Sequence, residues 1–433
     1  MPGIQCVSRN LTQSQPDFQR YINFTLEMEP ETKEIAIIGA GLAGLCLALA
    51  LGQQNIACTV YESRSASLNI GGAIMLSPNS LRILDDLEVY ECIREKGFNF
   101  DYVEYRDVEA DMTEKHEFGS YEKYGYNALR IYRRIVIDAF LTKLAKRNIP
   151  VVYGMKFKCI VTEAGDGVIW ESADGSQHSA SMLVGADGIH STVRDYLYPG
   201  LTPAFSGIAI IGAKLPATQL KLTPGFHLPV TLMSKRGAFI IAPQDVHCTE
   251  VMIAKQKRFE DPGIAGWDAV EADKQSMVDF LQKEAGGFPE IIHNAVSNIP
   301  TENTAIWPFY TVPRLERWSS PQHRIIIVGD AAHAIPPPAG QGTNQAYEDV
   351  YMFALLLAQA KKTDIRKALN FWQSYRQGRI GAIMALTNQI NLRRMPKEEG
   401  KEDEQLEDFN LDWLYSVDLK EVVNDWIAHE CAE

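Results

Sequence analysis

Three glycines, Gly39, Gly41 and Gly44, stand where a β-branched run passes into a longer apolar run. Gly39 permits a tight turn, Gly41 lets a phosphate approach the backbone, and Gly44 lets the following helix pack closely. An acidic residue, Glu62, ends the next strand-like run, where it can accept hydrogen bonds from ribose hydroxyls. The pattern predicts a dinucleotide site at a helix N-terminus, without distinguishing FAD from NAD. The contacts predicted here are Gly39, Gly41, Leu42, Ala43, Gly44, Glu62 and Ser63.

Two later segments narrow this prediction. Asp187–Arg194 reads DGIHSTVR, and Gly329–His333 reads GDAAH and precedes Pro337, Gly340–Asn344 and Glu348-Asp349. Together with the glycine segment, and in this order, they resemble the fingerprint of the single-component class A FAD-dependent monooxygenases, the para-hydroxybenzoate hydroxylase-like flavoproteins. The similarity extends from about Glu34 to Gln377. Near the C-terminus, Trp413-Leu414-Tyr415 is similar to salicylate hydroxylase-like members.

The resemblance implies noncovalent FAD, with NAD(P)H as a transient reductant. In this family NAD(P)H reduces the flavin and O2 adds at flavin C4a. The hydroperoxide then hydroxylates or epoxidises an electron-rich aromatic or alkene. Asp330 is expected to hydrogen-bond the ribityl chain, and the Pro337–Asn344 loop to pass the flavin ring. The further cofactor contacts implied are Gly72, Ala73, Arg133, Asp187, Asp330, Gly340, Gly342, Thr343 and Asn344, and the catalytic candidates are Arg194 and Pro337.

Several side chains have a second interpretation. Arg133 lies near a predicted helix start, where a cation is disfavoured unless an anion is nearby. Either Arg133 or its neighbour Arg134 could contact FAD, and a solvated surface arginine is the alternative. Arg194 could serve local packing and salt bridging instead of facing the flavin. His333 is expected to pack beneath its turn and not to act as an acid or base.

The sequence shows one dinucleotide-binding pattern, so it offers no second Rossmann domain to bind NAD(P)H. A flavin disulfide reductase would need a redox cysteine pair, which the sequence lacks. The remaining rivals are a flavin oxidase or dehydrogenase without oxygen insertion, and a nucleotide-binding sensor without turnover. Substrate identity is expected to depend on an antiparallel sheet, with a small aromatic, indole-type or polyketide-derived molecule of secondary metabolism as the expected class. The segments that would select it are Phe205–Ile211, Val230–Met233, Phe239–Pro243 and Trp307–Tyr310.

Composition limits the possible partners and compartment. Lys and Arg total 42 against 55 Asp and Glu, and the resulting net charge of −13 argues against nucleic acid. Seven scattered cysteines without a C-x-x-C pair are typical of reduced thiols in a cytoplasmic protein without a metal site. The apolar run from Ile35 to Gly52 is interpreted as a strand entering a buried helix, not as a transmembrane segment.

The sequence therefore predicts an α/β protein. Its fold class is a discontinuous Rossmann-like FAD-binding domain with an inserted antiparallel substrate domain and C-terminal helices. A single helix is expected from Ser77 to about Arg94, a strand over Phe100–Asp107 and a solvated linker over Lys397–Asp408. The predicted segments are a poorly ordered extension (1–33), two FAD-binding parts (34–200 and 306–378), the substrate domain (201–305) and a C-terminal helical region (379–433).

Overall fold

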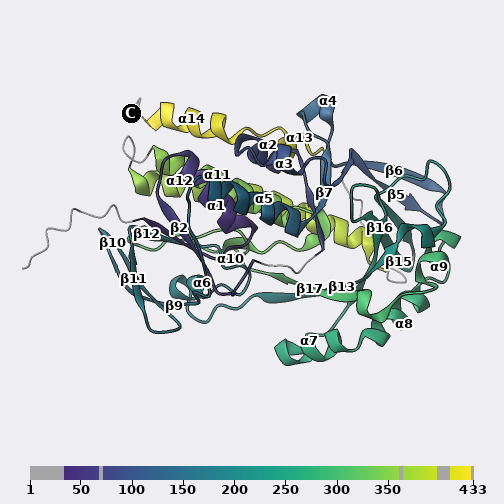
Figure 1. Cartoon of the computed structure of the whole chain (residues 1–433). Coiled ribbons are helices and arrows are strands. Elements are labelled where there is room, and N and C mark those ends of the chain that lie inside the picture. The colour runs from purple at the N-terminus through teal and green to yellow at the C-terminus, as the bar shows by residue number, and fades with distance from the viewer. Residues whose placement is uncertain (1–33, 68–71, 360–363, 397–409, 431–433) are drawn as a thin grey trace, which may run out of the picture. The chain divides into compact units, whose positions relative to one another are not determined.

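The computed structural model describes residues 34–67, 72–359, 364–396 and 410–430, apart from the side chains at 264 and 265 (Figure 1). Residues Glu34–Glu433 belong to one structural unit. The extension predicted over residues 1–33 and the linker predicted over Lys397–Asp408 lie outside the described residues. The domain boundaries expected within the unit remain predictions.

Five strands form the parallel sheet that carries the glycine segment, in the order β18-β12-β1-β2-β8. They are β18 (Ile325–Ile327), β12 (Met182–Gly185), β1 (Ile35–Ile38), β2 (Cys58–Glu62) and β8 (Val151–Tyr153). All neighbouring pairs are parallel. Strands β1, β12 and β18 are completely buried, which explains their apolar sequences. Because β18 joins from late in the chain, the sheet is discontinuous in sequence, as predicted.

Four helices form the layer next to this sheet (Figure 1). They are α1 (Leu42–Gln53), α5 (Arg133–Lys146), α11 (Gly342–Ala358) and α12 (Ile365–Arg394). Helix α1 packs on β1 and β2, α5 and α11 pack on α1, and α12 packs on α11. Every residue of α1 from Gly44 to Leu51 is buried. The apolar run from Ile35 to Gly52 is thus a strand followed by a buried helix, as the sequence predicted. Within the described residues, no helix has both the length and the apolar character that crossing a membrane requires.

A seven-stranded sheet forms the second layer, in the order β17-β13-β16-β15-β14-β5-β6. Its strands are β17 (Thr304–Thr311), β13 (Ala204–Pro216), β16 (Glu250–Arg258), β15 (Gly237–Pro243), β14 (Val230–Ser234), β5 (Tyr102–Asp107) and β6 (Met112–Glu117). All pairs are antiparallel except β14 with β5. The predicted antiparallel sheet is therefore present, and it also recruits β5 and β6 from the preceding part of the chain.

One face of this sheet packs against helices. Its apolar side chains form a core with α8 (Lys274–Glu284) and α9 (Glu290–Val296), while α7 (Gly263–Ala272) contacts β17. Figure 1 shows these three helices gathered around the strands of this layer.

Two three-stranded sheets complete the strand layers. One has the order β3-β7-β4, with β3 (Ala73–Leu76), β7 (Ala128–Tyr132) and β4 (Phe98–Phe100). The other has the order β11-β10-β9, with β11 (Gln177–Ala180), β10 (Gly167–Ser172) and β9 (Phe157–Ala164). The remaining helices are α2 (Pro78–Asp86), α3 (Tyr90–Ile93), α4 (Tyr121–Tyr124), α6 (Thr192–Leu197), α10 (Asp330–His333), α13 (Asp412–Tyr415) and α14 (Leu419–Glu430), with single 3-10 turns at Ala217–Leu220, Thr301–Asn303 and Pro337–Ala339.

The single helix expected from Ser77 to Arg94 is two helices, so that prediction is wrong. Glu88 adopts a positive φ of 60° between α2 and α3. Its N–H donates to the Asp85 carbonyl, and the Val89 N–H donates to the Leu84 carbonyl. These bonds close the end of α2, an arrangement that periodicity alone does not reveal.

Candidate active site

The glycine segment has the conformation that its spacing predicts. Gly39 has a φ of +107°, and a Cβ there would lie 2.5 Å from the Ala186 carbonyl oxygen. A Cβ on Gly44 would lie 2.0 Å from the Gly39 carbonyl oxygen. A Cβ on Gly41 would meet nothing within 4 Å. Gly39 and Gly44 are therefore required by the turn itself, whereas Gly41 faces open space into which a phosphate fits.

The N-terminus of α1 is suited to an anion. Gly41 is its N-cap, no side chain caps the helix, and its first turn contains no acidic residue. Its first N–H groups thus lack partners within the helix. Leu42 and Ala43 form this first turn. The site therefore offers free donors and a positive helix end next to the open space at Gly41.

Glu62 lies at the end of β2, beside the glycine turn. Its Oε2 accepts a hydrogen bond from the Ala40 N–H at 2.9 Å, and its Oε1 accepts from the Arg64 N–H at 2.9 Å. The Ser63 hydroxyl also donates to Oε1, at 3.1 Å, while the Ser63 side chain is exposed. These bonds fix the carboxylate next to the turn, where ribose hydroxyls of a dinucleotide would reach it.

The three sequence segments meet at the carboxyl ends of the parallel strands. A Cβ on Gly39 would lie 3.1 Å from the Asp187 Cα, and one on Gly329 would lie 3.5 Å from the Ala43 Cβ. The Val328 N–H donates to the Gly185 carbonyl. Segments separated by more than a hundred residues thus form one site, at the edge where ligands bind in such sheets.

Arg133 and Arg134 have different surroundings. Arg134 Nε donates to both oxygens of Asp138 at 2.7 and 2.8 Å, in an exposed pair one helical turn apart. Arg133 Nε is buried and has no hydrogen-bond partner. Its charge also acts on the carboxyl of Asp330. Arg133 is therefore the one whose side chain fits an anionic ligand in this site.

Asp330 begins α10 directly after the strained turn at Gly329, whose φ is +59°. Its side chain keeps access to solvent although protein surrounds it densely. This dense surrounding raises the pKa of the Asp330 carboxyl, while the charges of His333 and Arg133 oppose the rise. An accessible carboxylate in such surroundings fits a ligand hydroxyl, because hydrogen bonds to charged groups are strong there.

The loop before α11 presents the second free helix N-terminus. No side chain caps α11 and no acidic residue lies in its first turn, which contains Gly342 and Thr343. Pro337 is exposed, whereas Pro338 and Ala339 are buried. Gly340 has a φ of +62°, and a Cβ there would lie 2.8 Å from the Phe118 ring. The sequence did not indicate Phe118, because its contact with the loop joins segments far apart in the chain.

The side chain of Asn344 forms hydrogen bonds within the protein, and its predicted contact with the cofactor stays a prediction. Its Oδ1 accepts from the Ser77 N–H at 3.2 Å, and its Nδ2 donates to the carbonyls of Met75 at 3.1 Å and Gly340 at 2.6 Å. The side chain is therefore engaged in holding the loop against β3. Its backbone N–H remains at the free end of α11.

Gly72 and Ala73 lie at the start of β3, close to the seven-stranded sheet. The Ala73 N–H donates to Gln244 Oε1 at 3.3 Å, and the Gly72 carbonyl accepts from the Arg133 N–H at 3.4 Å. The expected cofactor contacts at Gly72 and Arg133 are thus adjacent in the fold. Gln244 was not indicated by the sequence.

Asp187 and Arg194 organise the second segment. The Asp187 carboxylate accepts from the Ser191 hydroxyl at 2.6 Å and from the Thr192 N–H at 2.8 Å, and burial raises its pKa. Arg194 donates to the carbonyls of Ala331 at 3.1 Å and Ile189 at 2.7 Å. Arg194 therefore joins the second segment to the third, which agrees with the packing interpretation. A catalytic role for Arg194 or Pro337 stays a prediction.

A buried charge network lies behind the Gly329 turn. His333 Nε2 lies 2.5 Å from Asp349 Oδ2, as expected for a packing residue beneath the turn. Arg376 Nε donates to Asp349 Oδ1 at 2.9 Å, and Arg379 Nε donates to Glu348 Oε2 at 2.7 Å. The sequence did not indicate Arg376 and Arg379, because both lie on α12 and only the fold brings them to α11.

The network contains ionised carboxylates. Burial raises the pKa of Glu348, but the charges of Arg376 and Arg379 outweigh it and lower the pKa to about 2. Burial also raises the pKa of Asp349, and the charges of His333 and Arg376 bring it below its ordinary value. Such fully buried charges are tolerated only when they are paired and hydrogen-bonded.

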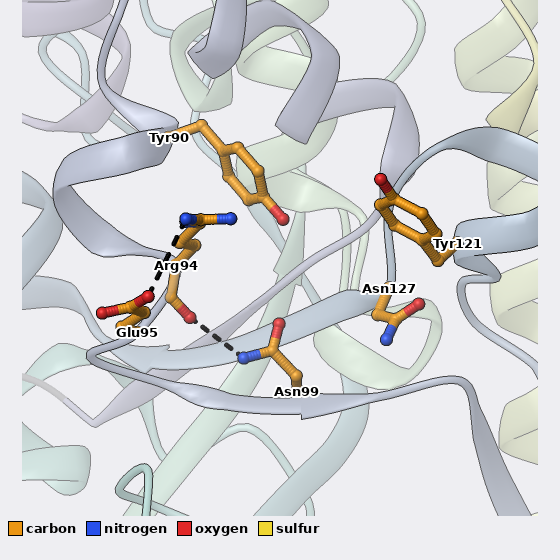
Figure 2. A pocket seen from close by; sticks show the side chains of 6 residues that line it. All are labelled: Tyr90, Arg94, Glu95, Asn99, Tyr121 and Asn127. Carbon is orange, nitrogen blue, oxygen red and sulfur yellow. Dashed lines mark hydrogen bonds and ion pairs between the residues drawn. The ribbon is translucent and has the colours of Figure 1, made fainter.

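A separate surface hollow of about 220 Å³ lies between α3, β4 and α4 (Figure 2). It is lined by Tyr90, Arg94, Glu95, Asn99, Tyr121 and Asn127. None of the expected cofactor contacts lines this hollow, so it is not the site described above.

The residues present fit FAD. Gly41 leaves space for the pyrophosphate, Arg133 carries an unpaired buried nitrogen, and Asp330 offers an accessible carboxylate. Two free helix N-termini, of α1 and α11, face the same site. FAD carries a negatively charged pyrophosphate in the middle of the molecule, and its isoalloxazine ring, at one end, gains negative charge on reduction, so it offers one anionic group to each helix N-terminus.

Comparisons with known proteins agree with this geometry. A family model described as FAD binding domain matches residues 32–387. The chain is 28% identical over 404 residues to 3-amino-4-hydroxybenzoate 2-monooxygenase PtnB3 of Streptomyces platensis, covering 90% of this chain and 97% of that protein. It is 24% identical over 371 residues to 6-hydroxynicotinate 3-monooxygenase of Pseudomonas fluorescens, covering 83% of this chain and 91% of that protein.

A solved structure extends the likeness to the fold. CtdE in complex with FAD and a substrate superposes with a TM-score of 0.75 at 20% identity, over 93% of this chain and 100% of that one. The fold class predicted from the sequence is therefore confirmed. Because the family match spans most of the chain, this protein belongs to the FAD binding domain family and is an FAD-dependent monooxygenase.

Proposed function

We propose that this monooxygenase hydroxylates a small, electron-rich aromatic substrate between the FAD site and the seven-stranded sheet. The observation that carries the proposal is the meeting of the glycine segment with the Gly329–Asp330 turn, where the charge of Arg133 acts on Asp330. The relatives named as acting on 3-amino-4-hydroxybenzoate and 6-hydroxynicotinate support an aromatic ring bearing an electron-donating substituent.

The chain's own residues bind and position the reactants. Gly41 and the α1 N-terminus would hold the pyrophosphate, Glu62 the adenosine ribose and Asp330 the ribityl chain. Gly342 and Thr343, in the first turn of α11, would donate N–H groups toward the negative charge of the reduced ring. When bound, FAD supplies the redox chemistry that activates O2.

The loop from Pro337 to Asn344 would form the wall between the flavin ring and the substrate. Asn344 ties this loop to β3, so the wall keeps a fixed position relative to that strand. Arg194 and the His333–Asp349 pair hold the Gly329–His333 segment in place on its buried side. We assign these three side chains a positioning role, because rigid placement of the reactants lowers the barrier of the chemical step.

NAD(P)H would bind transiently, since the chain has one dinucleotide-binding fold and FAD would occupy it. We place the protein in the cytoplasm, where NAD(P)H is present. No group of His, Cys, Asp or Glu in the described parts of the chain is arranged to hold a metal ion. The division into two FAD-binding parts and an inserted substrate domain over residues 201–305 is part of this proposal. It assigns the segments around β13, β14, β15 and β17 to substrate selection.

A panel assay tests the proposal. The flavin-loaded enzyme is mixed with hydroxylated and aminated aromatics, and NADH or NADPH oxidation is followed together with product mass. We expect at least one aromatic to accelerate NAD(P)H oxidation and to gain the mass of one oxygen atom. Substrate dehydrogenation without any gain of oxygen, across the panel, would support the oxidase interpretation instead.

A further inference from the structure

The Pro337–Asn344 loop is joined to the seven-stranded sheet by two contacts that the proposed function does not use. One contact is polar and comes from Arg394, the last residue of α12. The other is apolar and comes from Phe118, which directly follows β6. Neither residue belongs to the three fingerprint segments, and only the fold brings them to the loop.

Arg394 bonds to both sides of this joint. Its Nη1 donates to the Pro338 carbonyl in a long hydrogen bond of 3.4 Å, and its Nη2 donates to the Tyr105 hydroxyl at 2.8 Å. Tyr105 lies on β5 and is only 4% exposed. The guanidinium carbon also lies 5.7 Å from the centre of the Tyr105 ring. One planar side chain with several donors thus ties the loop to the sheet, which the compact ammonium group of a lysine would not reproduce.

The end of α12 is itself attached to the seven-stranded sheet. Asn391 Oδ1 accepts from Gln256 Nε2 of β16 at 3.0 Å. A Cβ on Gly237, the first residue of β15, would lie 3.1 Å from the Arg394 carbonyl oxygen. The Pro337–Ala339 turn packs against the same helix. The end of α12 therefore contacts the sheet and the loop together, and holds one relative to the other.

Phe118 provides the second contact, at the next part of the loop. A Cβ on Gly340 would lie 2.8 Å from the Phe118 ring, so this ring packs directly on the Gly340 backbone. The centre of the Phe118 ring lies 5.7 Å from that of Phe100. Phe118 also packs in an apolar cluster with Tyr105 and Met233 of the seven-stranded sheet. The ring that supports Gly340 is thus held by the sheet.

The position of Arg394 has a simpler explanation that must be separated from this one. Arg393 and Arg394 both lie in the last turn of α12, where a positive charge interacts favourably with the helix dipole. The dipole requires only a charge, and it does not direct the guanidinium of Arg394 to two partners outside the helix. A variant that preserves the charge therefore distinguishes the two explanations.

The two parts that these contacts join are the parts whose distance matters for the proposed reaction. Pro338 and Gly340 belong to the loop proposed as the wall between the flavin ring and the substrate. The seven-stranded sheet is the part proposed to select the substrate. A displacement of about 1 Å between reacting groups can lower a rate by about a hundredfold, so a fixed distance between wall and sheet has a direct effect on turnover.

We propose that Arg394 and Phe118 are positioning residues that hold the flavin wall at a fixed distance from the seven-stranded sheet. This inference rests on the proposed function and adds to it the residues that set the geometry between cofactor and substrate. Arg394 acts through Pro338, and Phe118 acts through Gly340. Neither side chain supplies a proton or an electron to the reaction.

The visible circular dichroism of the FAD-loaded protein tests the inference without any substrate, because this signal depends on the protein around the flavin ring. Arg394→Met and Phe118→Leu should change the spectrum, while the Kd for FAD stays close to that of the wild type. Arg394→Lys keeps the charge at the end of α12 but not the planar fork, and should restore the wild-type spectrum only in part.

Two substitutions away from the loop are matched controls. Arg366→Met removes an exposed arginine near the other end of α12, which pairs with Asp364. Trp426→Leu removes an aromatic ring of α14 that stacks on Phe371 at 4.9 Å. Both controls should leave the flavin spectrum unchanged, even where Trp426→Leu lowers the Tm.

Turnover measures the consequence for the reaction, with an aromatic that the wild-type enzyme oxygenates. In Arg394→Met and Phe118→Leu, a larger share of NAD(P)H should reduce O2 to hydrogen peroxide, a reaction that takes up one proton and transfers no oxygen to the substrate. The kcat for oxygenated product should fall by up to about a hundredfold, because only oxygen transfer needs the aligned substrate. The KM for NAD(P)H should stay close to that of the wild type.

Three outcomes would overturn the inference. Arg394→Met could keep both the wild-type flavin spectrum and the wild-type share of peroxide, a result that decides even if Phe118→Leu does not fold. Arg394→Lys could match the wild type in full, which would leave only the charge at the helix end. The controls could change the spectrum as much as Arg394→Met does, which would reduce the effect to lost stability. A wild-type protein that oxygenates no aromatic would contradict the proposed function instead, and the spectra would still decide whether these residues position the loop.

Discussion

The backbone N–H of Gly329 donates to the Asp349 carboxylate at 3.0 Å, so the turn that presents Asp330 is anchored to α11. The same helix begins at the predicted flavin loop. The turn that carries Asp330, the predicted ribityl contact, is therefore joined through α11 to the loop predicted to pass the flavin ring. His333 and Arg376 also pair with Asp349, on the buried side of this turn.

Substitution of Gly41 should affect FAD binding, whereas substitution of Gly44 should affect the stability of the fold. Gly41→Val should fold normally and lose FAD, because its Cβ points into open space that the pyrophosphate needs. Gly44→Val should unfold or destabilise the protein, because its Cβ would lie 2.0 Å from a backbone oxygen. Thermal unfolding and flavin content separate the two effects. Equal loss of stability in both variants would contradict the assignment of Gly41 to the ligand.

Adjacent arginines provide a matched pair. Arg133→Met should weaken FAD binding, since it removes the unpaired buried nitrogen beside Asp330. Arg134→Met should retain FAD, because it removes only an exposed pair with Asp138 worth about 0.3–0.5 kcal/mol. Titration of the apoproteins with FAD checks this. A weaker FAD affinity in Arg134→Met than in Arg133→Met would show that Arg134, and not Arg133, contacts FAD.

Asp330→Ala should weaken FAD retention and leave the fold intact. The carboxylate is accessible and its charge-assisted bond to a ligand hydroxyl is worth about 1.5–3 kcal/mol, or roughly ten- to a hundredfold in affinity. A FAD titration of the refolded apoprotein measures the change, with circular dichroism as the control for folding. Unchanged affinity would count against the assignment of Asp330 to the ribityl chain.

Acid should unfold the protein through its buried network. The pKa of Glu348 is lowered from 4.5 to about 2 in the fold, so its stabilising contribution is complete above 4.5 and is lost as the pH falls toward 2. Arg379→Met removes one of the charges that lower this pKa, and should move the acid transition to higher pH. Circular dichroism along an acid titration gives the midpoints. A midpoint that does not move would show that the Arg379–Glu348 pair does not govern acid stability.

The parts of the site that the sequence predicts are those whose causes are local. The glycine turn and the acidic residue at the end of β2 follow from spacing along one βαβ unit. Segments such as β12 and β18 read as buried strands because both of their faces are covered. Strands β1, β2, β12 and β18 and helix α1 were accordingly predictable, as was the discontinuity of the sheet, whereas β8 was not predicted.

The parts that the sequence did not predict depend on contacts between distant segments. Strand β5 reads as a strand, but its pairing with β14 joins residues more than a hundred positions apart. In the sequence, Arg376 is one polar residue of a long helix. Its partner Asp349 lies on α11, and only the fold brings the two side chains together. Arg394 is likewise one basic residue at the end of the same helix, and its bonds to Pro338 and Tyr105 are visible only in the fold. Side-chain roles of this kind are set by tertiary packing and not by local pattern.

Isotope labelling tests the monooxygenase assignment most directly. Turnover of an accepted aromatic under ¹⁸O2 should place one labelled atom in the product for each NAD(P)H consumed in a coupled cycle, as mass spectrometry of the product measures. Exchange with water is excluded by running the same product in H2¹⁸O. One labelled oxygen per product molecule is the result that the structure and the family predict. Unlabelled product with one hydrogen peroxide released per NAD(P)H would contradict the account and identify the protein as an oxidase.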